Sequence, residues 1–242
     1  MISRVTEYPG YLIRLREEAP SERAILFLHG FPALRGVKNL DIADYINRQF
    51  NEDVYLLHYK GLGESVGAFK FTESLAEASR VIELISQEKK HKELCLVGHS
   101  WGGLVALNMA QQHPDKVQSI VLLSPFCDVK KSDALYDWFV TGVKAELKHI
   151  FGEQSEEDIA EDFETIIANH LPKIIAPKLP SHTRVSIIQA SRDEVTPAAM
   201  MKTVLPLFMK SPTYVELDQD HSFTQSRKEL AETVAKLLSQ SG

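Results

Sequence analysis

The chain has 242 residues, of which 44% are hydrophobic and 25% are charged, values that are ordinary for a soluble globular protein. This length suits one α/β domain over residues 1–242, carrying an insertion, better than two domains. The formal net charge is −6 and the basic residues form no stripe. The composition therefore argues against nucleic-acid binding, which requires Lys and Arg to neutralise phosphates.

The two cysteines and the start of the chain bear on cellular location. Cys95 lies within a predicted buried strand and Cys127 follows another, so neither is expected to belong to a disulfide framework. The first residues lack the apolar stretch of a signal peptide, and no run of the sequence is long and apolar enough for a membrane span. A cytoplasmic protein is the default expectation.

Predicted strands and helices alternate along most of the chain. Residues 3–17 alternate weakly and break at Pro9-Gly10, which predicts a β-hairpin at a sheet edge. Apolar runs predict strands at 24–28, 53–59, 94–97, 117–123, 184–189 and 213–217. Helices are predicted at 37–50, 71–90 and 101–110, from Pro197 to about Met209, and at the end of the chain. This order indicates a mostly parallel sheet with helices on both faces and a ligand site beyond the carboxyl ends of its strands.

Residues 126–182 interrupt the alternation and are predicted to form an insertion. Helical patches occur at 134–151 and 156–170, without a convincing strand. Four of its aromatic residues either line a pocket or form the insertion's own small core, and the core is the favoured interpretation: Trp138, Phe139, Phe151 and Phe163. An acidic run either attracts cationic substrates or is a solvated helix face, the favoured interpretation: Glu153, Glu156, Glu157, Asp158, Glu161, Asp162 and Glu164.

The segment Gly98-His99-Ser100-Trp101-Gly102 fits the pattern G-x-S-x-G and joins a predicted strand to a predicted helix. A chain that makes this passage in so few residues holds its middle residue in a strained conformation, and the two glycines leave room for it. The hydroxyl of Ser100 then lies at the end of the sheet and at a helix N-terminus, where the dipole favours negative charge. Ser100 is therefore the candidate nucleophile.

The segment 98–103 resembles the nucleophile elbow of the α/β-hydrolase family, and His29-Gly30-Phe31 resembles the oxyanion loop of that family. The resemblance covers nearly the whole chain and implies an α/β-hydrolase fold, with a mostly parallel central sheet, helices on both faces and a small helical cap insertion at about 126–182. It assigns the oxyanion-hole NH groups to Phe31 and Trp101, while His29 is expected to brace the loop. Near the end of strand 53–59 and in the turn after it, the chain departs from the common family form at three positions, where Asp, Arg and His often stand: His58, Lys60 and Leu62.

A serine nucleophile needs a base to take its proton and a carboxylate to orient that base. The family order is Ser, then Asp or Glu, then His. Of the nine histidines, His221 alone follows a candidate acid and lies beyond the last strand, so it is the predicted general base. Asp193, after strand 184–189, is the predicted acid by family placement. Four other carboxylates remain rivals: Glu194, Asp128, Asp218 and Asp220.

The leading functional prediction is a serine carboxylesterase that acts on a small-molecule ester of small or medium acyl size through an acyl-enzyme. The segment His29-Gly30-Phe31-Pro32 and the short cap resemble those of intracellular esterases of this fold, including cinnamoyl and feruloyl esterases and monoacylglycerol lipases. An aminopeptidase or other amidase, or a thioesterase, would use the same triad. A non-catalytic ligand-binding protein of the same fold is the alternative from another class. No cofactor or metal is expected, because the sequence offers no zinc-ligand cluster and no phosphate-binding loop. The oligomeric state is left open.

Overall fold

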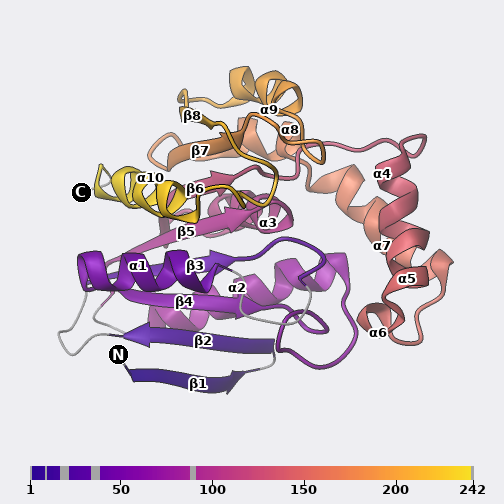
Figure 1. The fold of residues 1–242 in the computed structure, drawn as a ribbon, viewed down its shortest axis with the longest axis horizontal. Coiled ribbons are helices and arrows are strands. Elements are labelled where there is room, and N and C mark those ends of the chain that lie inside the picture. Colours follow the sequence, from indigo (N-terminus) through magenta and orange to yellow (C-terminus); the bar gives the residue numbers. More distant parts are fainter. Residues whose placement is uncertain (1, 9, 17–21, 34–38, 88–90, 241–242) are drawn as a thin grey trace.

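The fold, taken from a computed structural model that describes residues 2–8, 10–16, 22–33, 39–87 and 91–240, is built on one eight-stranded sheet of order β1-β2-β4-β3-β5-β6-β7-β8 (Figure 1). Its strands are β1 (Ile2–Tyr8), β2 (Gly10–Arg16), β3 (Arg23–Leu28), β4 (Asp53–His58), β5 (Glu93–His99), β6 (Val117–Leu123), β7 (Arg184–Ala190) and β8 (Thr213–Leu217). The six strands from β3 to β8 pair in parallel. Strands β1 and β2 form an antiparallel hairpin at the edge, and β2 pairs antiparallel with β4. The predicted edge hairpin and parallel sheet are confirmed.

Helices cover both faces of the sheet (Figure 1). On one face lie α1 (Leu40–Phe50) and α10 (Arg227–Ser239), and on the other lie α2 (Phe71–Gln87), α3 (Trp101–Gln112), α8 (Pro172–Ile175) and α9 (Ala198–Val204). Side chains of β5 alternate between the two faces: Cys95 and Val97 pack with α1 and α10, whereas Leu96 packs with α2 and α3. A strand that is covered on both faces must be apolar at every position, which explains the short apolar run in the sequence.

One helix ends earlier than predicted, and two other predicted helix bounds cannot be compared with the structure. The helix predicted to run to Met209 ends at Val204 and is followed by a single 3₁₀ turn, η3 (Leu205–Leu207). Pro206 explains the early end, because it has no N–H with which to continue the helical hydrogen bonds. The predicted start of a helix at Val37 and the predicted end at Lys90 lie outside the described residues.

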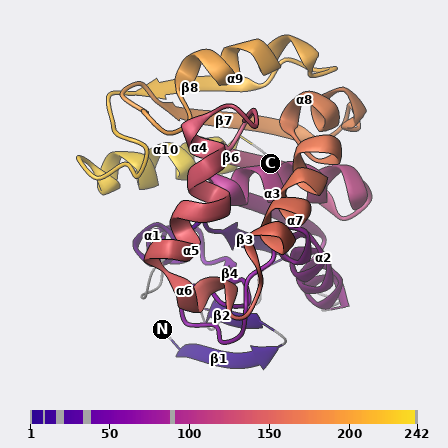
Figure 2. The same ribbon diagram turned by 90° about the vertical axis from the view of Figure 1, so that its right-hand side faces the viewer.

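The insertion between β6 and β7 is helical, as predicted, and lies beyond the carboxyl ends of the parallel strands (Figures 1 and 2). Its helical segments are α4 (Ala134–Asp137), the π-helical turn η1 (Trp138–Gly142), α5 (Val143–Glu146), α6 (Lys148–Phe151), α7 (Glu156–Asn169), α8 and η2 (Ala176–Lys178). In the part of the chain that the structure describes, no helix is both long enough and apolar enough to cross a membrane.

An aromatic core joins this cap to the body of the protein. Phe139 stacks on Phe31 with ring centroids 5.4 Å apart, and Phe163 packs on Phe71 of α2 at 4.7 Å. Phe139, Phe151 and Phe163 are buried, and Trp138 is partly buried and packs against them. They belong to a core, as favoured, but this core is shared with Phe31 and Phe71 of the body and is not the cap's own. The cap is held on the body by aromatic packing. This packing fills part of the space beyond the carboxyl ends of the strands.

The acidic run of the cap has more partners than a solvated helix face would have. At the start of α7, Ser155 and Asp158 form a reciprocal capping box. One turn further along α7, Asp162 accepts hydrogen bonds from the backbone N–H groups of Phe71 (2.5 Å) and Thr72 (3.3 Å), at the start of α2. The solvated interpretation is therefore wrong for Asp162, which caps a helix in the body of the protein.

Candidate active site

Ser100 lies at the junction of β5 and α3 with φ 51° and ψ −115°, a conformation that side-chain-bearing residues rarely adopt. The two flanking glycines allow it. A Cβ atom on Gly98 would overlap the carbonyl group of Gly102, and a Cβ atom on Gly102 would overlap the carbonyl group of Leu28. The G-x-S-x-G spacing is thus required by the close approach of three backbone segments.

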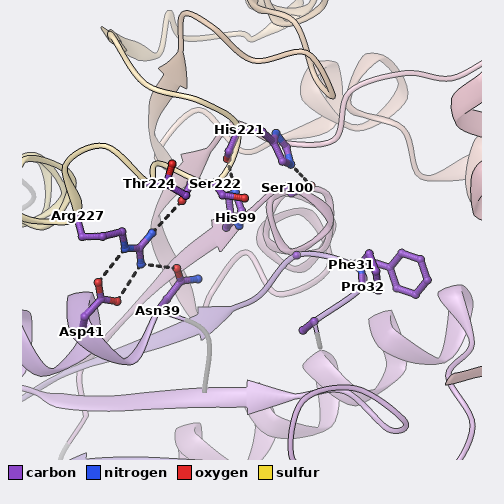
Figure 3. A pocket seen from close by; sticks show the side chains of 12 residues that line it. Phe31, Pro32, Asn39, Asp41, His99, Ser100, His221, Ser222, Thr224 and Arg227 are labelled. Atoms are coloured by element: carbon purple, nitrogen blue, oxygen red, sulfur yellow. Dashed lines mark hydrogen bonds and ion pairs between the residues drawn. The ribbon is translucent and has the colours of Figure 1, made fainter. Parts of the chain in front are cut away.

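The structure brings Ser100, His221 and Asp193 together from three loops. Nε2 of His221 lies 3.0 Å from Oγ of Ser100 (Figure 3). Nδ1 of the same imidazole lies 2.8 Å from Oδ2 of Asp193. Ser100 and Asp193 are 6% and 5% exposed, respectively. The three side chains form a continuous hydrogen-bonded chain, in which a proton can pass from the hydroxyl to the imidazole beside a fixed carboxylate.

The carboxylate of Asp193 is held by several donors. Burial alone would raise the pKa of Asp193, but the hydrogen bond and charge of His221, together with donors from Thr196, hold that pKa below its ordinary value. The donors from Thr196 are its backbone N–H, 2.7 Å from Oδ1, and its hydroxyl, 2.9 Å from Oδ2. Asp193 is therefore ionised at neutral pH and able to stabilise a protonated His221.

The rival carboxylates lie elsewhere or have other partners. Asp128 pairs with Lys173 at 2.9 Å, and Asp218 pairs with Arg192 at 2.9 Å. Asp220 accepts hydrogen bonds from Thr224 within its own loop, and Glu194 is exposed. The hydrogen bond to His221 distinguishes Asp193 from the four rivals.

The loop predicted to supply one oxyanion donor lies directly against Ser100. A Cβ atom on Gly30 would lie 3.1 Å from Cβ of Ser100, so the missing side chain lets this loop approach the nucleophile. Phe31 follows and lines the same cavity as Ser100. Trp101 is the first residue of α3, and its ring is buried, with Nε1 donating to Ser74. Any contact of Trp101 with a reacting group must therefore come from its backbone.

His29 has structural contacts, and so do the three residues that depart from the common family form, at the end of β4 and in the turn after it. His29 is buried and its Nδ1 lies 2.8 Å from the carbonyl oxygen of Gly30 within its own loop, consistent with the predicted bracing. Nδ1 of His58 accepts from the backbone N–H of Glu64 at 3.0 Å, and the backbone N–H of Lys60 donates to Glu77. Leu62 is buried. In this chain the turn is therefore held by backbone N–H groups that donate to His58 and Glu77.

A cavity of about 470 Å³ opens beside Ser100 (Figure 3). Its lining includes polar residues that the sequence did not single out: Asn39, Asp41, His99, Ser222, Thr224 and Arg227. Within the described residues, no group of three or more His, Cys, Asp or Glu side chains is arranged to hold a metal ion. For two of these polar lining residues the sequence held a signal, namely a position near a candidate catalytic residue. His99 directly precedes Ser100, and Arg227 begins the helix after His221.

Arg227 is the centre of a polar group in this cavity. Its Nε and Nη2 donate to the two carboxylate oxygens of Asp41 at 2.8 and 2.9 Å, and Nη2 also donates to Oδ1 of Asn39 at 3.0 Å. The hydrogen bond from Arg227 is the main cause that lowers the pKa of Asp41. The two charges largely neutralise each other, so this wall of the cavity is polar without a strong net charge.

Comparisons with known proteins agree with the fold. A family model described as alpha/beta hydrolase fold matches residues 23–215. A proline iminopeptidase of Arabidopsis thaliana is 32% identical over 127 residues, which are 51% of this chain and 31% of that protein. The protein bem46 of Schizosaccharomyces pombe is 23% identical over 123 residues, which are 50% of this chain and 41% of that protein. The chain thus spans less than half the length of these relatives.

Solved structures match over a greater length. A monoacylglycerol lipase of Paleococcus ferrophilus aligns with a TM-score of 0.71 and 16% identity, over 96% of this chain and 99% of that one. Est1E of Butyrivibrio proteoclasticus, solved with ferulic acid bound, aligns with a TM-score of 0.73 and 14% identity, over 96% of both chains. At such low identity these structures show a shared fold. With a family model that matches most of its length, this chain belongs to the alpha/beta hydrolase fold family.

Proposed function

We propose that the protein is a serine hydrolase that cleaves a carboxylic ester of small or medium acyl size. The observation that carries this proposal is the hydrogen-bonded chain in which Nε2 of His221 lies 3.0 Å from Oγ of Ser100 and Nδ1 lies 2.8 Å from Asp193. Ser100 also lines a cavity of about 470 Å³, which has room for a small ester. Membership of the hydrolase family supports the same reaction class.

In the first step, Nε2 of His221 takes the proton of the Ser100 hydroxyl while Oγ forms a bond to the ester carbonyl carbon. Asp193 stabilises the imidazolium that results. The carbonyl oxygen becomes an oxyanion, and the backbone N–H groups of Phe31 and Trp101 are the donors proposed to stabilise it. His221 then gives its proton to the alkoxide oxygen as the carbon–oxygen bond breaks, so the alcohol leaves and the acyl group stays on Ser100.

In the second step, a water molecule replaces the alcohol. His221 takes one proton from the water, and the water oxygen attacks the acyl carbon through the same oxyanion geometry. The bond to Oγ breaks, Oγ regains the proton from His221, and the carboxylic acid leaves. Both steps use the same three side chains, and the scheme calls for no cofactor.

An amide or thioester substrate is the second candidate. A curated relative, 32% identical over 127 residues, is a proline iminopeptidase, and this favours an amide substrate. The match covers about half of this chain. The third candidate is a non-catalytic binding protein. Such a protein has no need of a strained serine hydrogen-bonded to a histidine that is in turn hydrogen-bonded to a buried carboxylate. The organisation as one domain, 1–242, with a cap at about 126–182, stays a prediction.

The test is hydrolysis of p-nitrophenyl esters of increasing acyl length, followed by the matching anilides and thioesters. Ser100→Ala should lower kcat by about 10⁴-fold or more, because the nucleophile is removed. Ser239→Ala, an exposed serine at the end of α10, is the matched control and should retain the activity. Ester hydrolysis that survives in Ser100→Ala would contradict the proposal. Cleavage of anilides without cleavage of esters would show that the protein is an amidase and not an esterase.

A further inference from the structure

The loop between β8 and α10 carries His221, and two successive carbonyl groups of this loop accept hydrogen bonds from side chains outside it. Nε2 of His99, the last residue of β5, lies 2.8 Å from the carbonyl oxygen of His221 itself (Figure 3). Nη1 of Arg227, the first residue of α10, donates to the carbonyl oxygen of Ser222 at 3.2 Å. The main chain at the proposed base is therefore held at two successive peptide groups.

The protonation of His99 follows from its partner. A carbonyl oxygen can only accept, so the proton of a neutral His99 must lie on Nε2. Burial lowers the pKa of His99 to about 4, and the neighbouring His221 adds to the effect. His99 is thus neutral at pH 7, with its single N–H committed to His221. The two rings lie 5.1 Å apart, and a neutral His99 adds no second positive charge when His221 takes up a proton.

Arg227 is held in turn by the start of α1. Its bidentate contact with Asp41 and its hydrogen bond to Asn39 leave little rotational freedom to the guanidinium group. The loop of His221 is consequently tied to β5 through His99 and to α1 through Arg227. Both anchors belong to regular elements of the sheet and its helical layer, which move less than loops do.

We propose that His99 is a positioning residue for the reaction, and that together with Arg227 it fixes the main chain of His221 so that Nε2 stays within reach of Ser100. This inference rests on the proposed function. The imidazole of His221 has two rotatable bonds, and Asp193 restrains only its far nitrogen. The hydrogen bond from His99 also fixes the carbonyl group of His221. The main chain and the imidazole of His221 are then both held, and together they set the position of Nε2 relative to Ser100. Small displacements of such groups cost catalysis heavily.

The experiment compares two amides at position 99. In His99→Gln the amide nitrogen lies close to where the imidazole Nε2 was, whereas in His99→Asn it falls short of the carbonyl oxygen of His221. For p-nitrophenyl acetate hydrolysis, His99→Asn should lower kcat roughly 10- to 100-fold with KM within about twofold, and His99→Gln should stay within about threefold of the wild type. Arg227→Met should lower kcat roughly 3- to 10-fold. Arg48→Gln, which breaks an exposed pair with Asp44 on α1, is the matched control and should leave kcat unchanged.

The rate at which a p-nitrophenyl phosphonate modifies Ser100 gives a second readout of the same geometry, because that reaction needs the activated nucleophile but no deacylation. It should follow the order wild type, Gln, Asn. Equal loss in the Gln and Asn variants, or no loss in either, would overturn the inference while Ser100→Ala remained inactive. Full activity of Ser100→Ala would instead overturn the proposed function. If circular dichroism shows that His99→Asn does not fold, the comparison of Arg227→Met with Arg48→Gln decides whether the contacts to this loop position His221.

Discussion

Asp193 and Thr196 are joined by two hydrogen bonds across three residues of the loop after β7. The backbone N–H of Thr196 donates to Oδ1 at 2.7 Å, and its hydroxyl donates to Oδ2 at 2.9 Å. Oδ2 is also the oxygen that faces Nδ1 of His221. The orientation of the Asp193 carboxylate is therefore set by its own loop. It does not depend on the hydrogen bond to His221 alone.

Thr196→Val keeps the shape of the side chain and removes its hydroxyl. Because Oδ2 of the buried Asp193 then loses one donor, we expect the free energy of unfolding to fall by about 1–2 kcal/mol. Turnover should fall roughly 3- to 10-fold as the carboxylate gains freedom. Urea denaturation and ester kinetics measure the two effects. Thr203→Val, at an exposed position of α9, is the control, and an equal change in both variants would refute the role of this hydroxyl.

Asp193→Asn tests which carboxylate orients His221. The amide keeps the volume of the side chain but removes the charge and favours the wrong tautomer of the imidazole, so kcat should fall by about 10⁴-fold while the protein stays folded. Asp128→Asn, which weakens a pair with Lys173, should leave kcat near the wild-type value. A large loss in Asp128→Asn together with a small one in Asp193→Asn would transfer the role to the rival acid.

Asp162→Ala should loosen the cap. It removes the carboxylate that accepts from the backbone at Phe71 and Thr72, so the start of α2 loses its capping group. We expect a loss of about 1–2 kcal/mol in the free energy of unfolding, the usual cost of a lost N-cap. Glu157→Ala, an exposed acidic residue of the same helix, should cost less than about 0.5 kcal/mol. Comparable losses in the two variants would show that net charge of the acidic run matters more than this contact.

Phe163→Ala should be the most damaging change in the cap. The ring is fully buried and lies 4.7 Å from Phe71 and 4.9 Å from Phe139, measured between ring centroids. Its removal leaves a cavity between cap and body, with an expected loss of about 3–5 kcal/mol. Thermal unfolding followed by circular dichroism measures it. Leu207→Ala, at a partly exposed position, supplies the comparison, and a similarly small loss in both would mean that the cap does not depend on this core.

The pair of Asp41 and Arg227 predicts a dependence of stability on pH. The pKa of Asp41 is lowered in the folded protein from its ordinary value of 3.8, mainly by its hydrogen bond to Arg227. A carboxyl whose pKa falls on folding stabilises the protein above that ordinary value, and the stabilisation is lost as the pH falls through the folded pKa. The pair is partly exposed, so its contribution should be at most about 1 kcal/mol. The difference in unfolding free energy between wild type and Asp41→Asn should therefore be present at pH 7 and shrink below pH 3.8; a difference that grows on acidification would contradict it.

The sequence by itself determined those features whose cause is local. Leu94–Val97 had to be a doubly covered strand because it is apolar at every position, and the glycines around Ser100 had to bracket a tight turn because no side chain fits there. The edge hairpin and the helical cap follow from patterns of the same kind. Even here the local pattern missed one helix end: α9 ends at Val204, before Pro206, and not at Met209 as predicted.

Only the tertiary structure decided which groups far apart in the chain meet. Several carboxylates follow strands, and the sequence alone did not separate them by contact; in the fold, Asp193 is the one hydrogen-bonded to His221. Asp162 was grouped with a solvated acidic face, although it caps α2 from 91 residues away. Arg227 and Asp41 are separated by 186 residues, and His99 and the carbonyl of His221 by 122. Hydrogen bonds of this kind depend on how the sheet brings its loops together, and no local period of the sequence records that arrangement.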